Sequence, residues 1–327
     1  MPSIETATAL REETPGNEAR ERSTRAGAPN EYFAVSADDH AKRSGRVRKM
    51  RPLWMLILSL WFAACGGDGS DAGTSDAHNQ DGTGDEGPRI LEFYYGLDML
   101  PPLANLLCMN MVVAGLDGAP VTFSVQLDGA SVDPSDFIVE TATGERVTPD
   151  CATLRPAVEP LELRTVLLIG TFGTADSQPR AVEVVGVLQE LNGAEFGGLR
   201  FEDVTPLEAG PDLVLAERYL PDNPGIGGEC PPDSAQVVQL VWGGGVSGPA
   251  GTALGEPQRL GVSIQLEDGT TVQPTALVDD DPDNFVIACL DASSPAVEAS
   301  VAPGLFHDPR DDPNPATTVT VTDRTRE

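Results

Sequence analysis

The sequence of 327 residues has no lysine after Lys49, few aromatic residues and no two cysteines in a C-x-x-C arrangement. From Cys65 onward it holds 11 basic against 43 acidic side chains, a formal balance of −32. Such a chain repels phosphate backbones, so the sequence argues against nucleic acid as a partner. Aromatic residues make up only 5% of the chain, which argues against a carbohydrate platform of exposed aromatic rings.

The cysteines give no support to a zinc site, because they lack the paired spacing of zinc ligands and only His307 lies near them as a nitrogen ligand. Cys65 has a separate explanation, given below. The remaining four form an even set, which favours two disulfides in an oxidising compartment. Three pairings can be drawn, and the one that keeps each disulfide inside one expected unit joins Cys108 with Cys151 and Cys230 with Cys289.

Residues 50–65 combine a basic start, an apolar run from Leu53 to Phe62, two small residues and Cys65. The run is shorter than the roughly 20 residues that a transmembrane helix needs, and its length suits the apolar region of a signal peptide. The segment resembles the signal peptides of bacterial lipoproteins, with Phe62-Ala-Ala-Cys65 in the place of their lipobox, although leucine is more usual where Phe62 stands.

The resemblance implies that residues 50–64 are removed and that Cys65 carries the lipid. Gly66 replaces the aspartate that resembles an inner-membrane retention signal, so the resemblance favours the outer membrane, on its periplasmic or its surface face. The membrane is then a partner through the lipid anchor, with an unknown envelope protein or glycan as a further partner.

The segments on either side of this signal are expected to be disordered. Residues 65–88 are rich in glycine and aspartate and almost free of apolar side chains, which is typical of a flexible tether. Residues 1–49 are polar and charged, with no sustained apolar period. Translation can therefore be expected to begin at Met50, with a long leader before the signal as the alternative.

The remainder is expected to be all-β, as two Ig-like β-sandwich units or a single larger sandwich, because short strand-like runs alternate with Gly, Pro and Asp. A linker over residues 219–229 would separate a first β domain, 89–218, from a second, 230–327. A short helical turn is expected in Asp98–Leu107. The expected strands are Ile90–Tyr95, Val121–Leu127, Phe137–Thr141, Leu163–Phe172, Ala181–Gln189, Asp212–Ala216, Gln236–Trp242, Leu260–Leu266, Phe285–Leu290, Ala296–Val301 and Thr317–Thr322.

The two expected units show one local similarity. The segment Phe123–Pro134 resembles Val262–Pro274, since each contains a strand-like run, an acidic-glycine turn, a second short run and a proline. The similarity raises the hypothesis of a duplication, against the alternative that strand-turn-strand segments converge.

Two loops concentrate oxygen ligands of the kind that Ca²⁺ prefers. Neither matches the twelve-residue EF-hand loop. The alternative is that acidic loops of an acidic protein simply form turns and bind no cofactor. The candidate ligands are Asp279, Asp280, Asp281, Asp283 and Asn284 in one loop and Asp308, Asp311, Asp312 and Asn314 in the other.

Function is expected to be non-catalytic: a membrane-anchored envelope lipoprotein that acts as a binding or structural module, stabilised by Ca²⁺ if the two loops bind it. His307 is the only histidine in the expected folded part, and the sequence predicts no catalytic residues. The alternatives are a surface-displayed hydrolase that uses a pair of carboxylates and a component of an envelope assembly.

Overall fold

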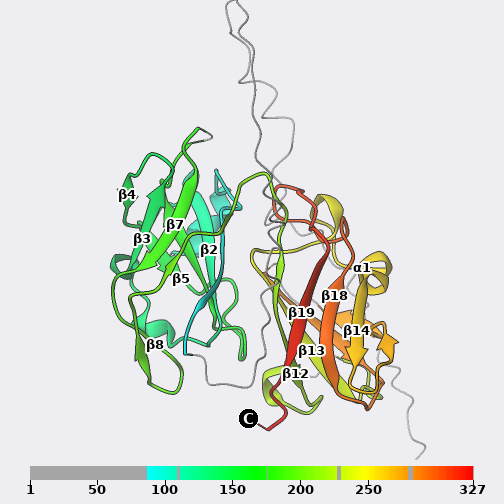
Figure 1. Ribbon diagram of the computed structural model, residues 1–327. Coiled ribbons are helices and arrows are strands. Elements are labelled where there is room, and N and C mark those ends of the chain that lie inside the picture. The colour runs from blue at the N-terminus through cyan, green and yellow to red at the C-terminus, as the bar shows by residue number, and fades with distance from the viewer. Residues whose placement is uncertain (1–86, 109–110, 175, 227–229, 279–282, 327) are drawn as a thin grey trace, which may run out of the picture.

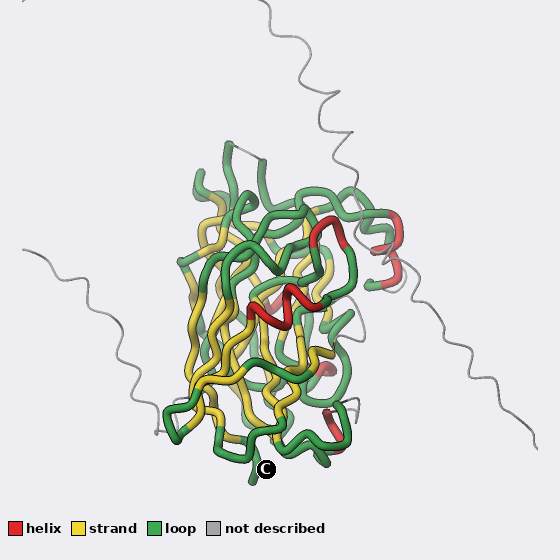
Figure 2. Tube along the Cα trace, turned by 90° about the vertical axis from the view of Figure 1, so that its right-hand side faces the viewer, coloured by secondary structure: helices red, strands yellow, loops and turns green. Residues whose placement is uncertain are grey.

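The computed structural model describes residues 87–108, 111–174, 176–226, 230–278 and 283–326. The all-β prediction is confirmed: strands dominate, and the helices are single short turns between them (Figures 1 and 2). The expectations for residues 1–86 lie outside the described part of the chain.

Nineteen strands are present in the described residues, and every one of the eleven expected strands overlaps one of them. The helical turn expected before Cys108 is confirmed as η2, Pro102–Leu106. The short helix α1, Glu256–Gly261, was not expected. The strands are β1 (Ile90–Tyr94), β2 (Asp117–Phe123), β3 (Phe137–Thr141), β4 (Arg146–Val147), β5 (Cys151–Thr153), β6 (Thr165–Gly170), β7 (Pro179–Val184), β8 (Leu188–Gln189), β9 (Glu195–Phe196), β10 (Arg200–Phe201), β11 (Val204–Thr205), β12 (Leu213–Tyr219), β13 (Gln236–Trp242), β14 (Val262–Leu266), β15 (Thr271–Val272), β16 (Ala276–Val278), β17 (Phe285–Leu290), β18 (Ala296–Val301) and β19 (Thr317–Asp323).

The first unit is a β-sandwich of two sheets, one in the order β11-β1-β2-β6-β5 and the other in the order β10-β7-β3-β4. The strands alternate in the direction of their side chains, so one face of each sheet turns toward the other. Phe93, Val121 and Leu168 from the first sheet pack against Phe137 and Val182 from the second in one buried core.

The second unit is built from a single sheet of eight strands in the order β15-β14-β18-β19-β12-β13-β17-β16. The sheet encloses one core, because buried residues of β14 and β18 belong to the same cluster as those of β13 and β17. Trp242 and Phe306 lie in this core with their ring centroids 4.5 Å apart. This unit is therefore also sandwich-like, but the hydrogen-bonded ladder continues from one layer into the other (Figure 1).

The two units have the same topology and the same pairing register. In each, the first strand pairs antiparallel with the second and parallel with the last: β1 with β2 and β11, and β12 with β13 and β19. The β3–β7 and β14–β18 ladders share one register, including an irregularity at the same step. The single strand β19 occupies the positions that β10 and β11 occupy in the first unit. Because β19 is continuous, it joins the two layers of the second unit into one sheet.

The register also corrects the sequence alignment of the halves. β14 is equivalent to β3, which starts at Phe137, and not to the end of β2 near Phe123. In the structural alignment, Gly144 and Gly269 are equivalent, and each has φ of 83° in the turn after its strand. The hypothesis of a duplication is thus supported by topology, but the matching segments begin at Phe137 and Val262 and not at Phe123 and Val262.

The boundary between the sheets lies earlier than the sequence suggested. β12 was expected to close the first unit, but it pairs with β13 and β19 and so belongs to the eight-stranded sheet. Hydrophobic patterning finds a strand but gives no information on which sheet it joins, because pairing partners are distant in sequence. Val204–Thr205, paired with β1, is the last strand of the first unit.

Candidate functional site

The two units meet through equivalent sheets. Strands β1, β2, β6, β13 and β17 are buried on nearly every residue, so both of their faces are covered. One face packs into the core of its own unit and the other lies toward the neighbouring unit. This interface holds most of the buried polar side chains and is the candidate site.

Its most buried charges are Arg164 and Glu217, whose side chains are 2% and 0% exposed. Arg164 Nη2 lies 2.7 Å from Glu217 Oε2 and joins the loop before β6 to strand β12. The same carboxylate accepts hydrogen bonds from the hydroxyl of Tyr219 at 2.8 Å and from Nε of Arg324 at 3.0 Å. Arg164 thus joins this carboxylate to the first unit, while Tyr219 and Arg324 hold it from within its own unit.

Tyr94 on β1 of the first unit makes a hydrogen bond to the second unit, just as Glu217 of the second unit binds Arg164 of the first. Its hydroxyl donates to Asp308 Oδ2 at 2.7 Å, and Asp308 Oδ1 accepts from the backbone N–H groups of Arg310 and Asp312. Burial raises the pKa of Asp308 to about 6 and raises that of Tyr94 well above its usual range. Asp308 therefore organises its own loop and fixes it to the first unit.

Glu92 lies on the same strand, two residues earlier. Its Oε1 accepts a hydrogen bond of 2.6 Å from the hydroxyl of Thr205, and Gly243 of the second unit lies against its side chain. Burial raises the pKa of Glu92 to about 7, and the nearby charges of Asp212 and Asp203 act in the same direction. Glu92 therefore titrates near neutral pH inside the interface.

A small pocket of about 60 Å³ opens at this interface. Its lining is mainly apolar, and Tyr94, Ala157, Leu167, Asp283 and Asn284 contribute to it from both units. Its size suits one methyl-bearing group or a few waters.

The repeat shows that the position equivalent to one wall of this pocket is covered on the second unit. On the second unit, Leu161 and its neighbours cover the outer face of the sheet, where Leu161 packs near Ile287. The residue equivalent to Ile287 on the first unit is Leu167, which lines the pocket instead. Asn284, equivalent to Arg164, is too short to fill the space, and its Nδ2 donates to Thr165 Oγ1 at 2.9 Å.

Carboxylates converge beside this pocket. Oxygen atoms of Glu159, Glu162 and Asp283 lie within 4.8 Å of one another, and Glu162 and Asp283 are buried. Among the described residues, this is the group of carboxylates whose spacing suits a shared cation. Two of its three members were not candidates in the sequence, because Glu159 and Glu162 come from a loop without a dense run of acids.

The first predicted calcium loop is only partly described, since Asp279, Asp280 and Asp281 lie outside the described residues. Asp283 Oδ1 accepts from the backbone N–H of Phe285 at 2.7 Å. The Asn284 amide donates to Trp242 O and to Thr165. Both residues hold the start of β17.

The second predicted loop is held by its own hydrogen bonds. Asn314 Oδ1 accepts from the N–H groups of Leu305 and Phe306, both at 2.9 Å. Asp311 Oδ1 lies 2.9 Å from His307 Nδ1 and accepts from the backbone of Ala250, while Asp312 is partly exposed. The described members of the two loops do not form a common group of three metal-ligating side chains.

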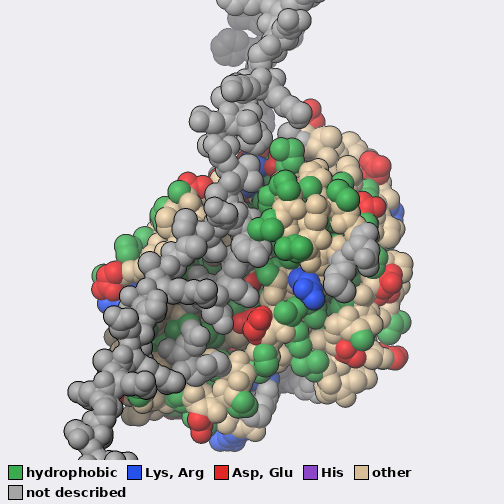
Figure 3. Space-filling model, turned by 180° about the vertical axis from the view of Figure 1, so that it is seen from behind, with side chains coloured by type: hydrophobic (Ala, Val, Ile, Leu, Met, Phe, Trp, Pro, Cys, Tyr) green, Lys and Arg blue, Asp and Glu red, His purple; other side chains and the backbone are tan. Residues whose placement is uncertain are grey.

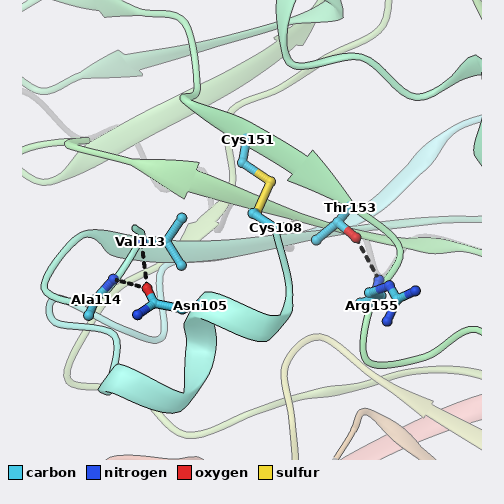
Figure 4. The surroundings of a disulfide bond; sticks show 7 residues. All are labelled: Asn105, Cys108, Val113, Ala114, Cys151, Thr153 and Arg155. Atoms are coloured by element: carbon cyan, nitrogen blue, oxygen red, sulfur yellow. Dashed lines mark hydrogen bonds between the residues drawn. A yellow bond between two sulfur atoms is a disulfide. The ribbon is translucent and has the colours of Figure 1, made fainter. Parts of the chain in front are cut away.

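The disulfide pairing expected from the sequence is confirmed, with Cys108 bonded to Cys151 (Figure 4) and Cys230 bonded to Cys289. In each unit, one cysteine lies between the first two long strands and the other lies on the strand pair β5–β6 or β16–β17. Each disulfide thus fixes the first long connection of its unit to the outer face of the sheet.

A scan against protein-family models finds no match for this chain, and a search of the curated proteins finds no similar sequence. In the described residues, no helix has the length and apolar character needed to cross a membrane.

Proposed function

We propose that the protein is an exported bacterial envelope lipoprotein, held to the outer membrane by lipid on Cys65, and that its folded part is a non-catalytic binding or structural module. The disulfides carry this proposal. Each unit has one disulfide within it, and structural disulfides persist in oxidising compartments such as the periplasm or the cell surface. The lipoprotein-like segment that ends at Cys65 implies the same cellular location.

The use of the polar side chains supports a structural or binding role. Asp308, Asn284 and Asn314 hold loops or join the units through their hydrogen bonds. The interfacial pocket is mainly apolar, and among the described residues Asp283 is the one carboxylate in its lining. A glycoside hydrolase of the usual kind needs two carboxyl groups flanking its substrate, so this pocket suits the capture of a small apolar group better.

Intact mass spectrometry of the protein from membranes of its native host tests the proposed lipid anchor and location. The expected mass corresponds to a chain that begins at acylated Cys65 and gains four hydrogens when its two disulfides are reduced. The Cys65→Ser variant is the matched control, and its mass should carry no acyl groups. A chain that begins at Met1 without acyl mass would overturn the proposal.

A thermal melt of the same sample tests the calcium sites expected from the sequence. A cation that binds only the folded protein raises the melting temperature in proportion to RT ln(1 + [L]/Kd). A higher melting temperature in Ca²⁺ than in chelator supports such a site, and Asp283→Asn then distinguishes the group around Asp283 from the loop around Asp308. Identical melting temperatures rule out stabilisation by Ca²⁺.

A further inference from the structure

One segment of the first unit differs in composition from the rest of this acidic chain. The segment 96–116 contains a single charged residue, Asp98, and is rich in leucine and methionine, whereas the whole chain carries a formal charge of −30. Asp98 itself is paired with Arg310 at 2.8 Å. We name the described part of this segment, residues 96–108 and 111–116, the apolar lobe.

The apolar lobe has a buried side and an exposed side. Leu97, Leu100, Ala104 and Val113 pack with Ile169 on the outer face of the sheet, beside the Cys108–Cys151 disulfide. Asn105 Oδ1 accepts from the N–H groups of residues 113 and 114, which fixes the lobe's second half to η2 (Figure 4). The exposed apolar side chains are Met99 (52%), Leu103 (37%), Leu106 (61%), Met111 (39%) and Val112 (81%).

The exposed side chains are held in place and do not belong to a loose loop. Leu103 and Leu106 are three residues apart in a 3₁₀-helix, so they project from the same side. The disulfide and the Asn105 hydrogen bonds hold the backbone on both sides of them. Figure 3 shows hydrophobic side chains gathered around a basic side chain on the rear face of the molecule. Exposed apolar side chains that are held close together in this way mark a site of contact with another body.

A basic side chain lies at the edge of the lobe. Arg155 is exposed and lines the interfacial pocket together with Leu97, Leu100 and Leu107 of the lobe. Among the described residues it makes no ion pair, so its guanidinium is available to a phosphate. Apolar side chains beside an arginine fit a surface that has phosphates above hydrocarbon.

The size of the lobe argues against a second copy of the chain as its occupant. A stable protein interface takes about 20–30 residues on each side. The lobe offers five exposed apolar side chains. Insertion into a lipid headgroup region needs only a few apolar side chains, provided that a second attachment holds the protein near the membrane.

We propose that the apolar lobe docks on the lipid surface to which the protein is anchored, with Leu106 and Val112 inserted and Arg155 at the phosphates. The inference rests on the proposed function, because the lipid on Cys65 brings the lobe to the bilayer. About 20 residues separate Cys65 from Gly87, and a chain of that length reaches at most about 70 Å. The lobe starts nine residues after Gly87. The lobe is therefore bound by chain length to stay near the proposed lipid attachment.

The experiment measures binding of a lipid-free protein to phosphatidylcholine vesicles by co-sedimentation. The chain begins at residue 65 and carries Cys65→Ser, so acylation cannot contribute to binding. All described strands, both cores and both disulfides lie between residues 87 and 326, so this chain keeps the whole described fold. Leu106→Glu with Val112→Glu tests the lobe. Val187→Glu with Leu191→Glu is the matched control, because these side chains are 56% and 55% exposed elsewhere.

We expect the lobe variant to need roughly tenfold more lipid for half-maximal binding, or more, while the control binds like the parent protein. Equal binding by the two variants, or no binding by the parent, would overturn the proposal. A dimer of the parent that the lobe variant dissociates would also overturn it in favour of a second copy. Coincident thermal melts of both variants show that the fold is intact. Failure of the lipid anchor would appear separately, in the mass of the native protein.

Discussion

Arg164 and Glu217 form an ion pair that lies inside the protein and joins the two repeats. The pair bridges the loop before β6 and strand β12, with 2.7 Å between Nη2 and Oε2. The repeat does not reproduce the pair, since Tyr94 stands at the position equivalent to Glu217 and Asn284 at that equivalent to Arg164. The two halves of the interface have thus diverged into a charged half and a half that contains the pocket.

Loss of one partner of this pair should destabilise the protein strongly. Glu217→Ala leaves the Arg164 guanidinium buried without its carboxylate, and such a change costs about 3–5 kcal/mol of the free energy of unfolding. Denaturant unfolding measures the loss. Glu256→Ala is the control, because the Glu256 side chain is 65% exposed and solvent screens its ion pair with Arg259. Equal losses in the two variants would contradict a structural role for the buried pair.

The stability of the protein should be highest near pH 4.5. The folded-state pKa of Glu92 is raised to about 7 and those of Asp117 and Asp308 to about 6, all by burial. The folded protein therefore binds more protons than the unfolded chain between about pH 4.5 and 7, and the free energy of unfolding falls as pH rises through that window. Below it, the opposite effect begins, because Glu140 and Asp268 have lowered pKa values. Melting temperatures from pH 4 to 8 measure the profile.

Glu92→Gln should remove part of this dependence. The amide keeps an oxygen that can accept from Thr205 but carries no charge to bury. At pH 8 we expect its free energy of unfolding to exceed that of the parent by on the order of 3 kcal/mol, and the difference should shrink as pH falls and vanish below about pH 4, where glutamate is protonated in the unfolded chain as well. Glu256→Gln, whose carboxylate is stabilised by Arg259, should show no such gain. A profile for Glu92→Gln that runs parallel to the parent's would contradict the assignment.

The sequence contains enough local information to predict the fold class and the disulfides. Thr317–Asp323 alternates in burial as a half-exposed strand does, and the even set of cysteines admitted few pairings. It could not predict the sheet to which β12 belongs, because that depends on its parallel pairing with β19, about 100 residues later. Strands of two residues, such as β4 and β15, are too short to show a period.

The candidate site was harder to predict than the fold. The acidic loops were visible as composition, but Asp308 and Asn314 turned out to hold turns through hydrogen bonds that composition does not reveal. The interface depends on Arg164, Glu217 and Tyr94, which come from separate segments and show no local signal. Their one sequence signature is the repeat, which becomes readable only when the register identifies equivalent strands.

Loss of either disulfide should lower stability by a similar amount. The bonds close loops with sequence separations of 43 and 59 residues, and the chain-entropy relation gives about 4 kcal/mol for each. Cys108→Ser with Cys151→Ser and Cys230→Ser with Cys289→Ser test this by denaturant unfolding. Removal of the first bond should also loosen the apolar lobe, which hydrogen exchange at residues 111–116 would detect as faster exchange. Unchanged exchange there would show that the Asn105 hydrogen bonds suffice to hold it.

The equivalence of the repeats makes a prediction for two glycines. Gly144 and Gly269 both have φ of 83°, and a Cβ built on either would meet no atom within 4 Å. Alanine at either site should therefore cost only the left-handed backbone conformation, about 1–2 kcal/mol, and the two losses should match. Gly255→Ala is the control, because its φ is −142° and its Cβ would make ordinary contacts. Asparagine, which tolerates the left-handed region better, should recover part of the loss at both sites. A large loss of stability at one glycine and none at the other would show that the two turns contribute differently to the stability of their sheets, despite their common register.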